Sequence, residues 1–193
     1  MVLDSQDIPH ISYYDRTNTN LKYATTNGAA WNSEIVDNGG SVGSYTSIAV
    51  DSQGDIHIGY YDATKDELKY VYRSGVPWNI EFVDSVGGLG SYTSLAVDDG
   101  GVPHMSYYDG INADLKYAVR SGGSWSKETV DNGAGVGAYT SLAFDKAGIP
   151  HISYYDWTAD DLKYAVKANG TWDLAVIESD GDVGRYTSLV LKY

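Results

Sequence analysis

The sequence predicts an all-β fold built from repeats. A unit of 47 residues recurs without insertion or deletion, and the four histidines mark it by their equal spacing: His10, His57, His104 and His151. Each unit holds four short segments of alternating or β-branched residues, separated by turns rich in Gly and Asp. No segment has the period or the length of a helix. Four short strands per repeated unit are typical of a β-propeller blade, so we expect four blades of 47 residues.

The second unit illustrates the expected strands in order. Residues 46–50 (TSIAV) form an apolar, β-branched strand, and the turn DSQGD follows it. Residues 56–62 (IHIGYYD) alternate, which predicts a strand with two different faces. Residues 68–72 (LKYVY) alternate again, and the turn that follows contains Gly75. Residues 78–84 (WNIEFVD) form the fourth strand, and a Gly-rich link leads to the next unit.

The two ends of the chain predict how the propeller closes. The units cover residues 1–46, 47–93, 94–140 and 141–187, and residues 186–193 (YTSLVLKY) are left as a closing strand. We expect Tyr186–Leu191 to supply the inner strand of the blade built from Ile8–Asp37, because closure removes open sheet edges. If that blade belongs to a second copy, two chains form an eight-bladed homodimer, which we favour because bulky Tyr and Trp side chains crowd a four-bladed centre. A four-bladed monomer is the alternative.

The repeated motifs resemble those of a known family. The resemblance is carried by the heptapeptide PHISYYD (Pro9–Asp15, Pro150–Asp156), the triplets LKY and YTS, and the repeated Trp. The chain resembles propeller repeats of the sialidase-like type, a family of short bacterial and archaeal repeats. The resemblance covers the whole chain. It implies the propeller fold but no activity, because propellers carry many unrelated functions.

Composition narrows the classes of partner. The formal net charge of −13 argues against nucleic acid and anionic membranes as partners. There is no cysteine, hence no disulfide framework and no thiolate metal site. No cofactor motif is found, because the Gly-rich links are not followed by a helix. We expect a soluble chain without a signal peptide, whose cellular location the sequence does not assign.

Two repeated residue types are predicted to be structural. Imidazole is the commonest metal ligand, but the histidines lie on the second strand of each unit rather than at the axis, so we interpret them as polar locks between blades and expect no metal site. The repeated tryptophans begin the fourth strand and are predicted to pack between blades, with sugar stacking as the alternative: Trp31, Trp78, Trp125 and Trp172. Calcium bound at the Asp/Gly turns is less favoured than simple turns.

The candidate ligand-binding residues are aromatic. In each YYD motif the two tyrosines lie on opposite strand faces, so one packs and the other is available to a ligand: Tyr14, Tyr61, Tyr108 and Tyr155. Trp157 is the one tryptophan outside the repeat, in a predicted exposed loop. It is the best single candidate for contact with a ligand or a partner chain, against the alternative that it folds back on its own blade.

Catalysis is not expected. Most carboxylates recur once per unit, as turn residues do, whereas an active site needs an asymmetric pair in a pocket. The four arginines do not form the cluster a sialidase needs. We therefore predict a non-enzymatic, lectin-like binding module with shallow sites repeated between blades. A self-assembling interaction scaffold without a small ligand is the alternative, and a sialidase-like glycosidase is the least favoured.

Overall fold

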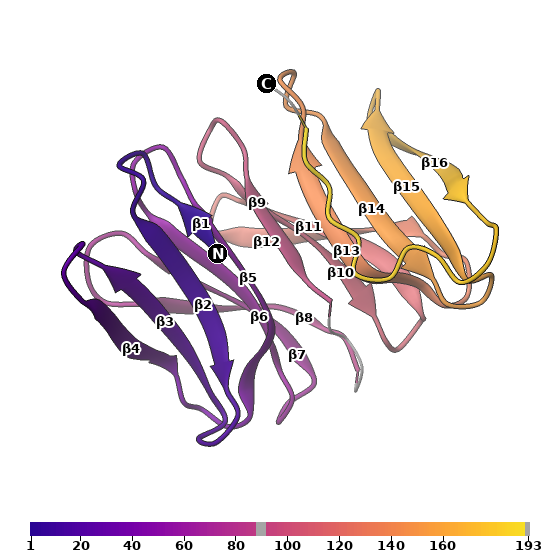
Figure 1. The fold of residues 1–193 in the computed structure, drawn as a ribbon. Helices are drawn as coiled ribbons and strands as arrows, with labels where there is room; N and C mark the ends of the chain where they lie inside the picture. Colours follow the sequence, from indigo (N-terminus) through magenta and orange to yellow (C-terminus); the bar gives the residue numbers. More distant parts are fainter. Residues whose placement is uncertain (88–91, 192–193) are drawn as a thin grey trace.

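The computed structural model describes residues 1–87 and 92–191 and shows four antiparallel four-stranded sheets (Figure 1). Each sheet is one blade of a β-propeller, so the predicted fold class is confirmed. The strands are short because turns with left-handed residues interrupt the chain, among them Gly54 (φ +85°) and Gly148 (φ +74°). Among the described residues, no helix is long and apolar enough to cross a membrane.

The strands follow the chain order within each blade. Blade 1 contains β1 (Val2–Leu3), β2 (Pro9–Asp15), β3 (Asn20–Thr26) and β4 (Trp31–Asp37). Blade 2 contains β5 (Val42–Val50), β6 (Ile56–Asp62), β7 (Glu67–Arg73) and β8 (Asn79–Ser85). Blade 3 contains β9 (Ser94–Val97), β10 (Pro103–Asp109), β11 (Asp114–Ser121) and β12 (Ser124–Asp131). Blade 4 contains β13 (Val136–Phe144), β14 (Pro150–Asp156), β15 (Asp161–Ala168) and β16 (Thr171–Glu178).

The hydrophobic core lies between neighbouring blades rather than inside one. One cluster joins blades 1 and 2 through Leu21, Val42 and Tyr60, and equivalent clusters join blades 2 and 3, and blades 3 and 4. A blade is a single sheet with two faces, so each face needs a neighbour to bury its apolar side chains. This explains why every residue of β6, a strand covered on both sides, is buried.

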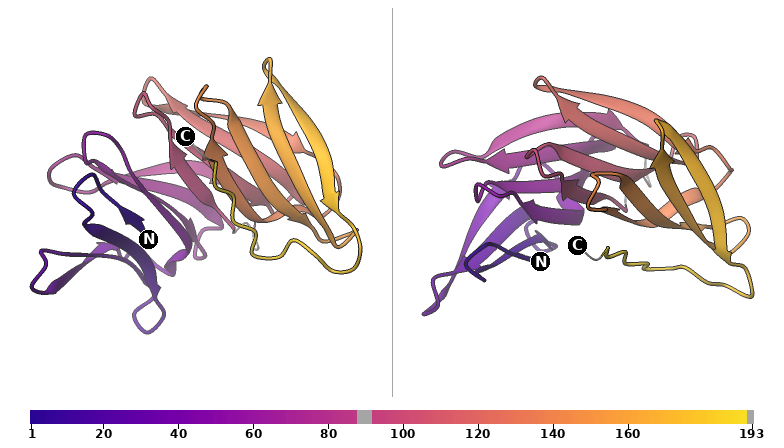
Figure 2. Two further views of the ribbon diagram at one scale, coloured as in Figure 1. Left: turned by 45° about the horizontal axis from the view of Figure 1, so that its top comes forward. Right: turned by 90° about the horizontal axis from the view of Figure 1, so that it is seen from above.

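The four blades follow an arc, with blade 1 and blade 4 at its two ends (Figure 2). Blade 1 receives its inner strand from β1, which pairs only with Pro9 and His10. The predicted closing strand, Tyr186–Leu191, does not pair with blade 1 of its own chain. Its residues Thr187 and Leu189 form hydrogen bonds to blade 4, and the segment belongs to no sheet. Lys192, Tyr193 and residues 88–91 of the predicted second unit lie outside the described residues.

Candidate functional site

A repeated set of polar contacts joins each blade to the next. The Tyr60 hydroxyl donates to Asp37 Oδ2 of the preceding blade over 2.7 Å, and Lys69 Nζ lies 3.7 Å from the same oxygen and 2.6 Å from Asp62 in its own blade. Burial and the Asp37 carboxylate raise the pKa of Tyr60, so its hydroxyl remains a donor. The same three-part contact recurs at the two following blade boundaries, with Asp84, Tyr107 and Lys116, and with Asp131, Tyr154 and Lys163.

A second polar contact crosses the same boundaries near the outer strands. Arg120 donates to both oxygens of Glu81 of the preceding blade, at 2.8 and 2.7 Å. The equivalent pairs are Arg73 with Glu34 and Lys167 with Glu128. These pairs were not predicted from the sequence. The signal was present, because the acid and the base are separated by 39 residues in every case.

The repeated tryptophans pack across the blade boundaries. Trp125 lies edge-on against Tyr70 of the preceding blade with ring centroids 5.1 Å apart, and Trp78 and Trp172 pack in the same way on Tyr23 and Tyr117. Trp31 begins β4, the outer strand of blade 1, packs on no tyrosine of another described blade, and has 56% of its surface exposed.

The histidines form bonds within their own blades. The Tyr70 hydroxyl lies 2.6 Å from His57 Nδ1, and His57 Nε2 lies 3.5 Å from Asp51 Oδ2. A carboxylate only accepts, so Nε2–H is the donor and Nδ1 accepts from tyrosine. The other histidines have the same neighbours: His10 with Tyr23 and Asp4, His104 with Tyr117 and Asp98, and His151 with Tyr164 and Asp145. The His104 ring also packs against Phe144 of the next blade, 4.8 Å between centroids.

The buried histidines predict a loss of stability in acid. Burial lowers the pKa of His57 and His104 below the ordinary value of about 6.5. The unfolded chain therefore binds more protons than the folded chain once the pH falls below about 6.5, so the free energy of unfolding decreases from there toward pH 5. Urea denaturation at pH 7.5 and 5.5 measures this, and the double variant H57Q/H104Q should show a smaller difference between the two pH values. An equal difference in the variant would assign the acid sensitivity to other groups.

Four tyrosines form a row along the inner edges of the blades, and we call them the axial tyrosines: Tyr45, Tyr92, Tyr139 and Tyr186. Neighbouring rings lie 5.0, 4.4 and 4.3 Å apart. All four have φ between +52° and +57°, a conformation that costs a bulky residue about 1–3 kcal/mol. In blades 2 and 4 the tyrosine lies where the strand register shifts, which turns its ring out of the sheet. Strained residues of this kind concentrate at functional sites.

The axial tyrosines border an aromatic cavity of about 210 Å³ lined by Tyr45, Tyr92, Tyr108 and Trp157, which we call the axial aromatic pocket. Trp157 stacks on Tyr139, with centroids 6.0 Å apart, and 41% of its surface is exposed. Burial, together with a hydrogen bond to Tyr139, raises the pKa of Tyr92, and burial raises that of Tyr108. A tyrosine hydroxyl has one proton, and Tyr92 gives it to Tyr139, so Tyr92 can accept from a ligand while Tyr108 can donate to one.

The structure places the five predicted ligand residues differently. Tyr108 and Trp157 line the axial aromatic pocket, and Tyr155 packs edge-on against Trp157. Tyr61 is buried and its hydroxyl donates to Asp66, while the Tyr14 hydroxyl lies 3.1 Å from Ser41 Oγ. The structure thus brings Tyr108, Tyr155 and Trp157 together. Sequence reasoning missed Tyr45 and Tyr92, although the recurring YTS triplet pointed to them.

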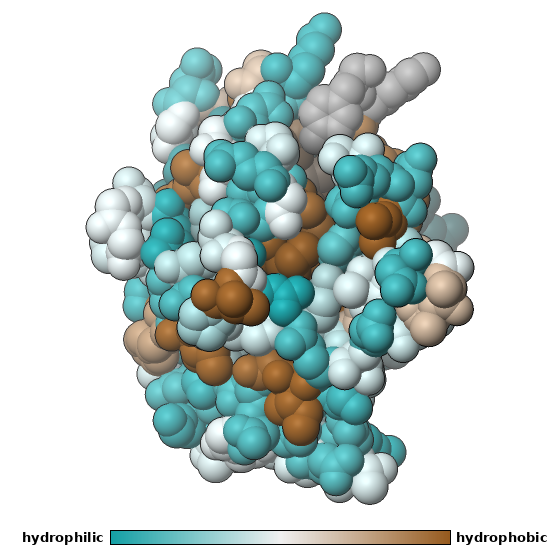
Figure 3. Space-filling model, turned by 90° about the vertical axis from the view of Figure 1, so that its left-hand side faces the viewer, coloured by the Kyte–Doolittle hydropathy of each residue, from teal (hydrophilic) through white to brown (hydrophobic). Residues whose placement is uncertain are grey.

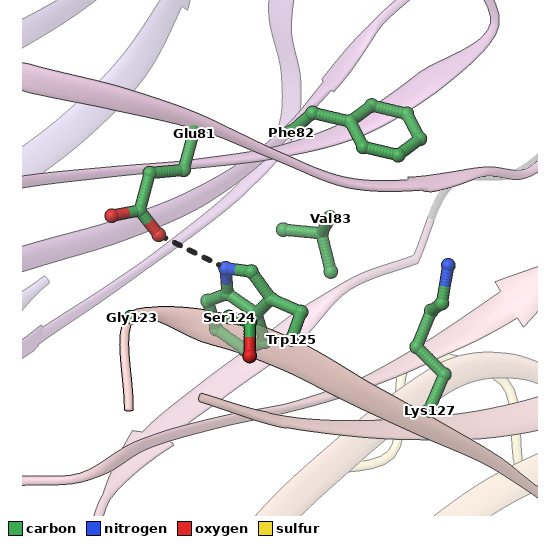
Figure 4. A pocket seen from close by; sticks show the side chains of 7 residues that line it. All are labelled: Glu81, Phe82, Val83, Gly123, Ser124, Trp125 and Lys127. Atoms are coloured by element: carbon green, nitrogen blue, oxygen red, sulfur yellow. Dashed lines mark hydrogen bonds between the residues drawn. The ribbon is translucent and has the colours of Figure 1, made fainter. Parts of the chain in front are cut away.

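A second candidate region is a shallow cleft of about 430 Å³ between blades 2 and 3 (Figure 4). Figure 4 shows Trp125 donating its indole N–H to Glu81, a bond of 3.1 Å, with Phe82 and Lys127 together at the other end of the cleft. A related cleft of about 260 Å³ lies between blades 1 and 2 beside Glu34 and Arg73. Glu81 is engaged by Arg120 and Trp125, so the polar groups of this cleft are largely bonded to one another.

Carboxylates are sparse in these cavities. The two clefts carry one glutamate each, and the axial aromatic pocket carries none. A further open cavity of about 310 Å³, lined by the four axial tyrosines and three threonines, also carries none. Among the described residues there is no group of three His, Cys, Asp or Glu side chains placed to hold a metal ion.

No protein-family model and no curated protein sequence matches the chain. Solved structures match at low sequence identity. A lectin of Aleuria aurantia, in complex with Fucα1-6GlcNAc, has a TM-score of 0.58 and 14% identity over 92% of this chain and 67% of the lectin. The exo-β-1,3-galactanase of Phanerochaete chrysosporium with β-1,3-galactotriose has a TM-score of 0.58 and 10% identity over 91% of this chain and 48% of the enzyme.

The NanB sialidase of Streptococcus pneumoniae has a TM-score of 0.58 and 14% identity over 81% of this chain and 27% of the sialidase. The chain therefore spans about half the galactanase and about a quarter of the sialidase. Identities this low are evidence for the fold alone. The comparisons support a β-propeller related in architecture to glycan-binding and glycan-cleaving proteins, and they do not identify the type of repeat.

Proposed function

We propose that the chain is a non-catalytic, carbohydrate-binding propeller, and that the axial aromatic pocket is its sugar site. The observation that carries the proposal is the lining of this cavity, in which three tyrosines and Trp157 provide aromatic faces together with phenol hydroxyls. Aromatic faces stack on the C–H face of a sugar ring, and the hydroxyls bond to the sugar hydroxyls. A lectin and two glycosidases have a similar propeller fold, which is compatible with sugar binding by this chain. The similarity does not identify which residues of this chain would bind a sugar.

The charge around the pocket favours a neutral sugar. Arg185 approaches Trp157, with its guanidinium carbon 5.6 Å from the ring centroid, but this cation is paired with Asp182 at 2.9 Å. An acidic sugar entering a chain with a net charge of −13 would also be repelled. No carboxylate lines the pocket, so the general acid and base of a glycosidase are not provided by its lining.

Binding can be tested on a glycan array followed by calorimetry with Fucα1-6GlcNAc, β-1,3-galactotriose and the strongest array hit. Trp157→Ala should weaken binding of that hit about tenfold, corresponding to about 1.4 kcal/mol for one aromatic contact. The matched control is Phe82→Ala, which removes another exposed aromatic ring, 52% exposed against 41% for Trp157, from the cleft between blades 2 and 3. If Phe82→Ala abolishes binding and Trp157→Ala does not, the sugar site is the cleft and the pocket assignment is wrong.

The second candidate function is a self-assembling scaffold without a small ligand. It is favoured by the apolar and aromatic side chains exposed at both ends of the arc, Trp31 in blade 1 and Ile177 in blade 4. If the chain bound no glycan on the array but still associated with itself, the scaffold would be favoured over the lectin. A homodimer is compatible with both functions.

A further inference from the structure

We infer that the free face of blade 4 binds blade 1 of a second copy of this chain, so that two chains close into an eight-bladed ring. This inference does not depend on the sugar site. It is carried by the contacts that the three internal blade boundaries share, because blade 4 and blade 1 present the two halves of the same contacts. In the following paragraphs a prime marks a residue of the second copy.

The free face of blade 4 lacks the cover that its equivalents have. Ile177 is 58% exposed, whereas the residues at the same position in the other blades are at most 8% exposed: Val36, Val83 and Val130. Tyr164 is half-buried, whereas its equivalents Tyr23, Tyr70 and Tyr117 are buried under a tryptophan of the next blade. The missing cover is therefore a blade whose outer strand carries a tryptophan, and among the described blades Trp31 is the repeated tryptophan without a blade to pack on.

The opposite face, on blade 1, is also exposed. Tyr13 is half-buried, whereas Tyr60, Tyr107 and Tyr154 are fully buried at the same position. Figure 3 views the molecule from this side and shows apolar patches among hydrophilic groups. Trp31 and Leu3 of blade 1 are both exposed. An apolar face of a blade requires a neighbouring blade for burial.

The charges of the two faces are complementary. Lys69, Lys116 and Lys163 each lie near two carboxylates, one in their own blade and one at the end of the preceding blade. Lys22 lies near Asp15 of its own blade, and its ion pairs among the described residues include no carboxylate of another blade. Glu178 ends blade 4 at the position of Asp37, Asp84 and Asp131, and it is exposed. Docking would place Glu178 beside Tyr13′ and Lys22′, which reproduces the internal contact.

The outer ion pair is missing from both faces together. Its acid, found at Glu34, Glu81 and Glu128, is replaced by Ala175 in blade 4. Its base, found at Arg73, Arg120 and Lys167, is replaced by Thr26 in blade 1. If the two faces contacted unrelated surfaces, the loss of the acid from blade 4 would not be expected to accompany the loss of the base from blade 1. Because they meet each other, neither face carries an unpaired charge into the boundary.

The closing strand, Tyr186–Leu191, is placed to complete blade 1′ at the axis of the ring. Leu189 N–H donates to Ser141 Oγ over 3.0 Å, as Leu142 does to Ser94 and Leu95 to Ser47. Tyr186–Leu189 thus already lies where the inner strand of a fifth blade begins, while β2 is paired by β1 only at Pro9 and His10. Pairing in the internal register, Ser141 with Ser153, aligns Ser188 with Ser12′. The axial tyrosine row then continues from Tyr186 to Tyr45′.

The mass in solution is the first measurement. Light scattering on a sizing column should give about 42 kDa, twice the chain mass of 20.9 kDa. Trp31→Ala should shift the chain toward 21 kDa, with a dissociation constant raised about thirtyfold or more, because a central tryptophan is an energetic hot spot in such interfaces. Phe82→Ala removes an aromatic ring of similar exposure outside the interface and should leave the dimer intact. A monomeric parent chain would overturn the inference.

The register is tested by a disulfide. The chain has no cysteine, so S12C/S188C introduces the sole pair of thiols. Directly opposed residues of antiparallel strands have Cα atoms about 4.5–5.5 Å apart, within reach of a disulfide. Mild oxidation should give a covalent dimer on a non-reducing gel, and neither single variant should do so to the same extent. A covalently closed monomer would show that the strand returns to its own blade 1, and an uncrosslinked dimer would show a different interface; either result overturns the inference.

Discussion

Gly137→Ala is expected to destabilise the chain by about 3 kcal/mol or more. Gly137 has φ +107°, a backbone conformation that side chains disfavour, and an added Cβ would lie 2.8 Å from Leu115 Cα of the preceding blade. Leu115 is fully buried and its backbone belongs to β11, so the contact cannot be relieved by a side-chain rotation. Strain and overpacking therefore add at this position. Urea denaturation at one fixed protein concentration measures the loss.

The matched control is Gly148→Ala in the same blade. Gly148 also has a positive φ, +74°, but an added Cβ would meet nothing within 4 Å. It should therefore cost only the backbone strain, about 1–2 kcal/mol. If the two substitutions lowered the free energy of unfolding equally, the contact of residue 137 with the Leu115 backbone would not contribute to the loss.

Asp131→Ala is the second substitution with a large expected effect. Burial acts to raise the pKa of Asp131, but hydrogen bonds from Lys163, Gly133 and Tyr154 outweigh burial and hold the pKa below its ordinary value. Removal of the carboxylate leaves the Tyr154 hydroxyl buried without its acceptor and takes one of two carboxylates from Lys163. We expect a loss of about 3 kcal/mol in the free energy of unfolding.

Glu178→Ala is the matched control, since Glu178 occupies the same position on the free face of blade 4. Glu178 is exposed, so the unfolding free energy measured on the monomeric background of Trp31→Ala should change by about 0.5 kcal/mol or less. In the parent chain the same substitution should weaken the dimer. A large loss on the monomeric background would contradict the view that this position acts only between two chains.

The sequence predicted the strands because their signals are local. The heptapeptide around His57 alternates and ends in a turn, and the structure forms β6 over the same residues, Ile56–Asp62. The inner strand was less well bounded: residues 46–50 were predicted, and β5 begins at Val42. Its first half contains the register shift at Tyr45, and a bulge interrupts the alternation from which a strand is recognised.

The candidate site was predictable only in part. Trp157 was found because it breaks the repeat, and Tyr108 because it belongs to a repeated aromatic pair. Tyr45 and Tyr92 were missed because their approach to Trp157 depends on the left-handed backbone that turns their rings toward the axis. The pairs of Glu81 with Arg120 and Glu34 with Arg73 were missed for a similar reason, since they join blades rather than neighbouring residues.

By itself the sequence determined the repeat, the strand order and the all-β class, because turn residues and alternation act over a few residues. Only the tertiary structure decided which repeated residues meet. Neighbouring blades bury their faces against each other, so Asp37 finds Tyr60, and the tryptophans find the tyrosines of the preceding blade. The same packing left Trp31 and Ile177 uncovered at the ends of the arc, because a blade face is buried only when another blade stands beside it.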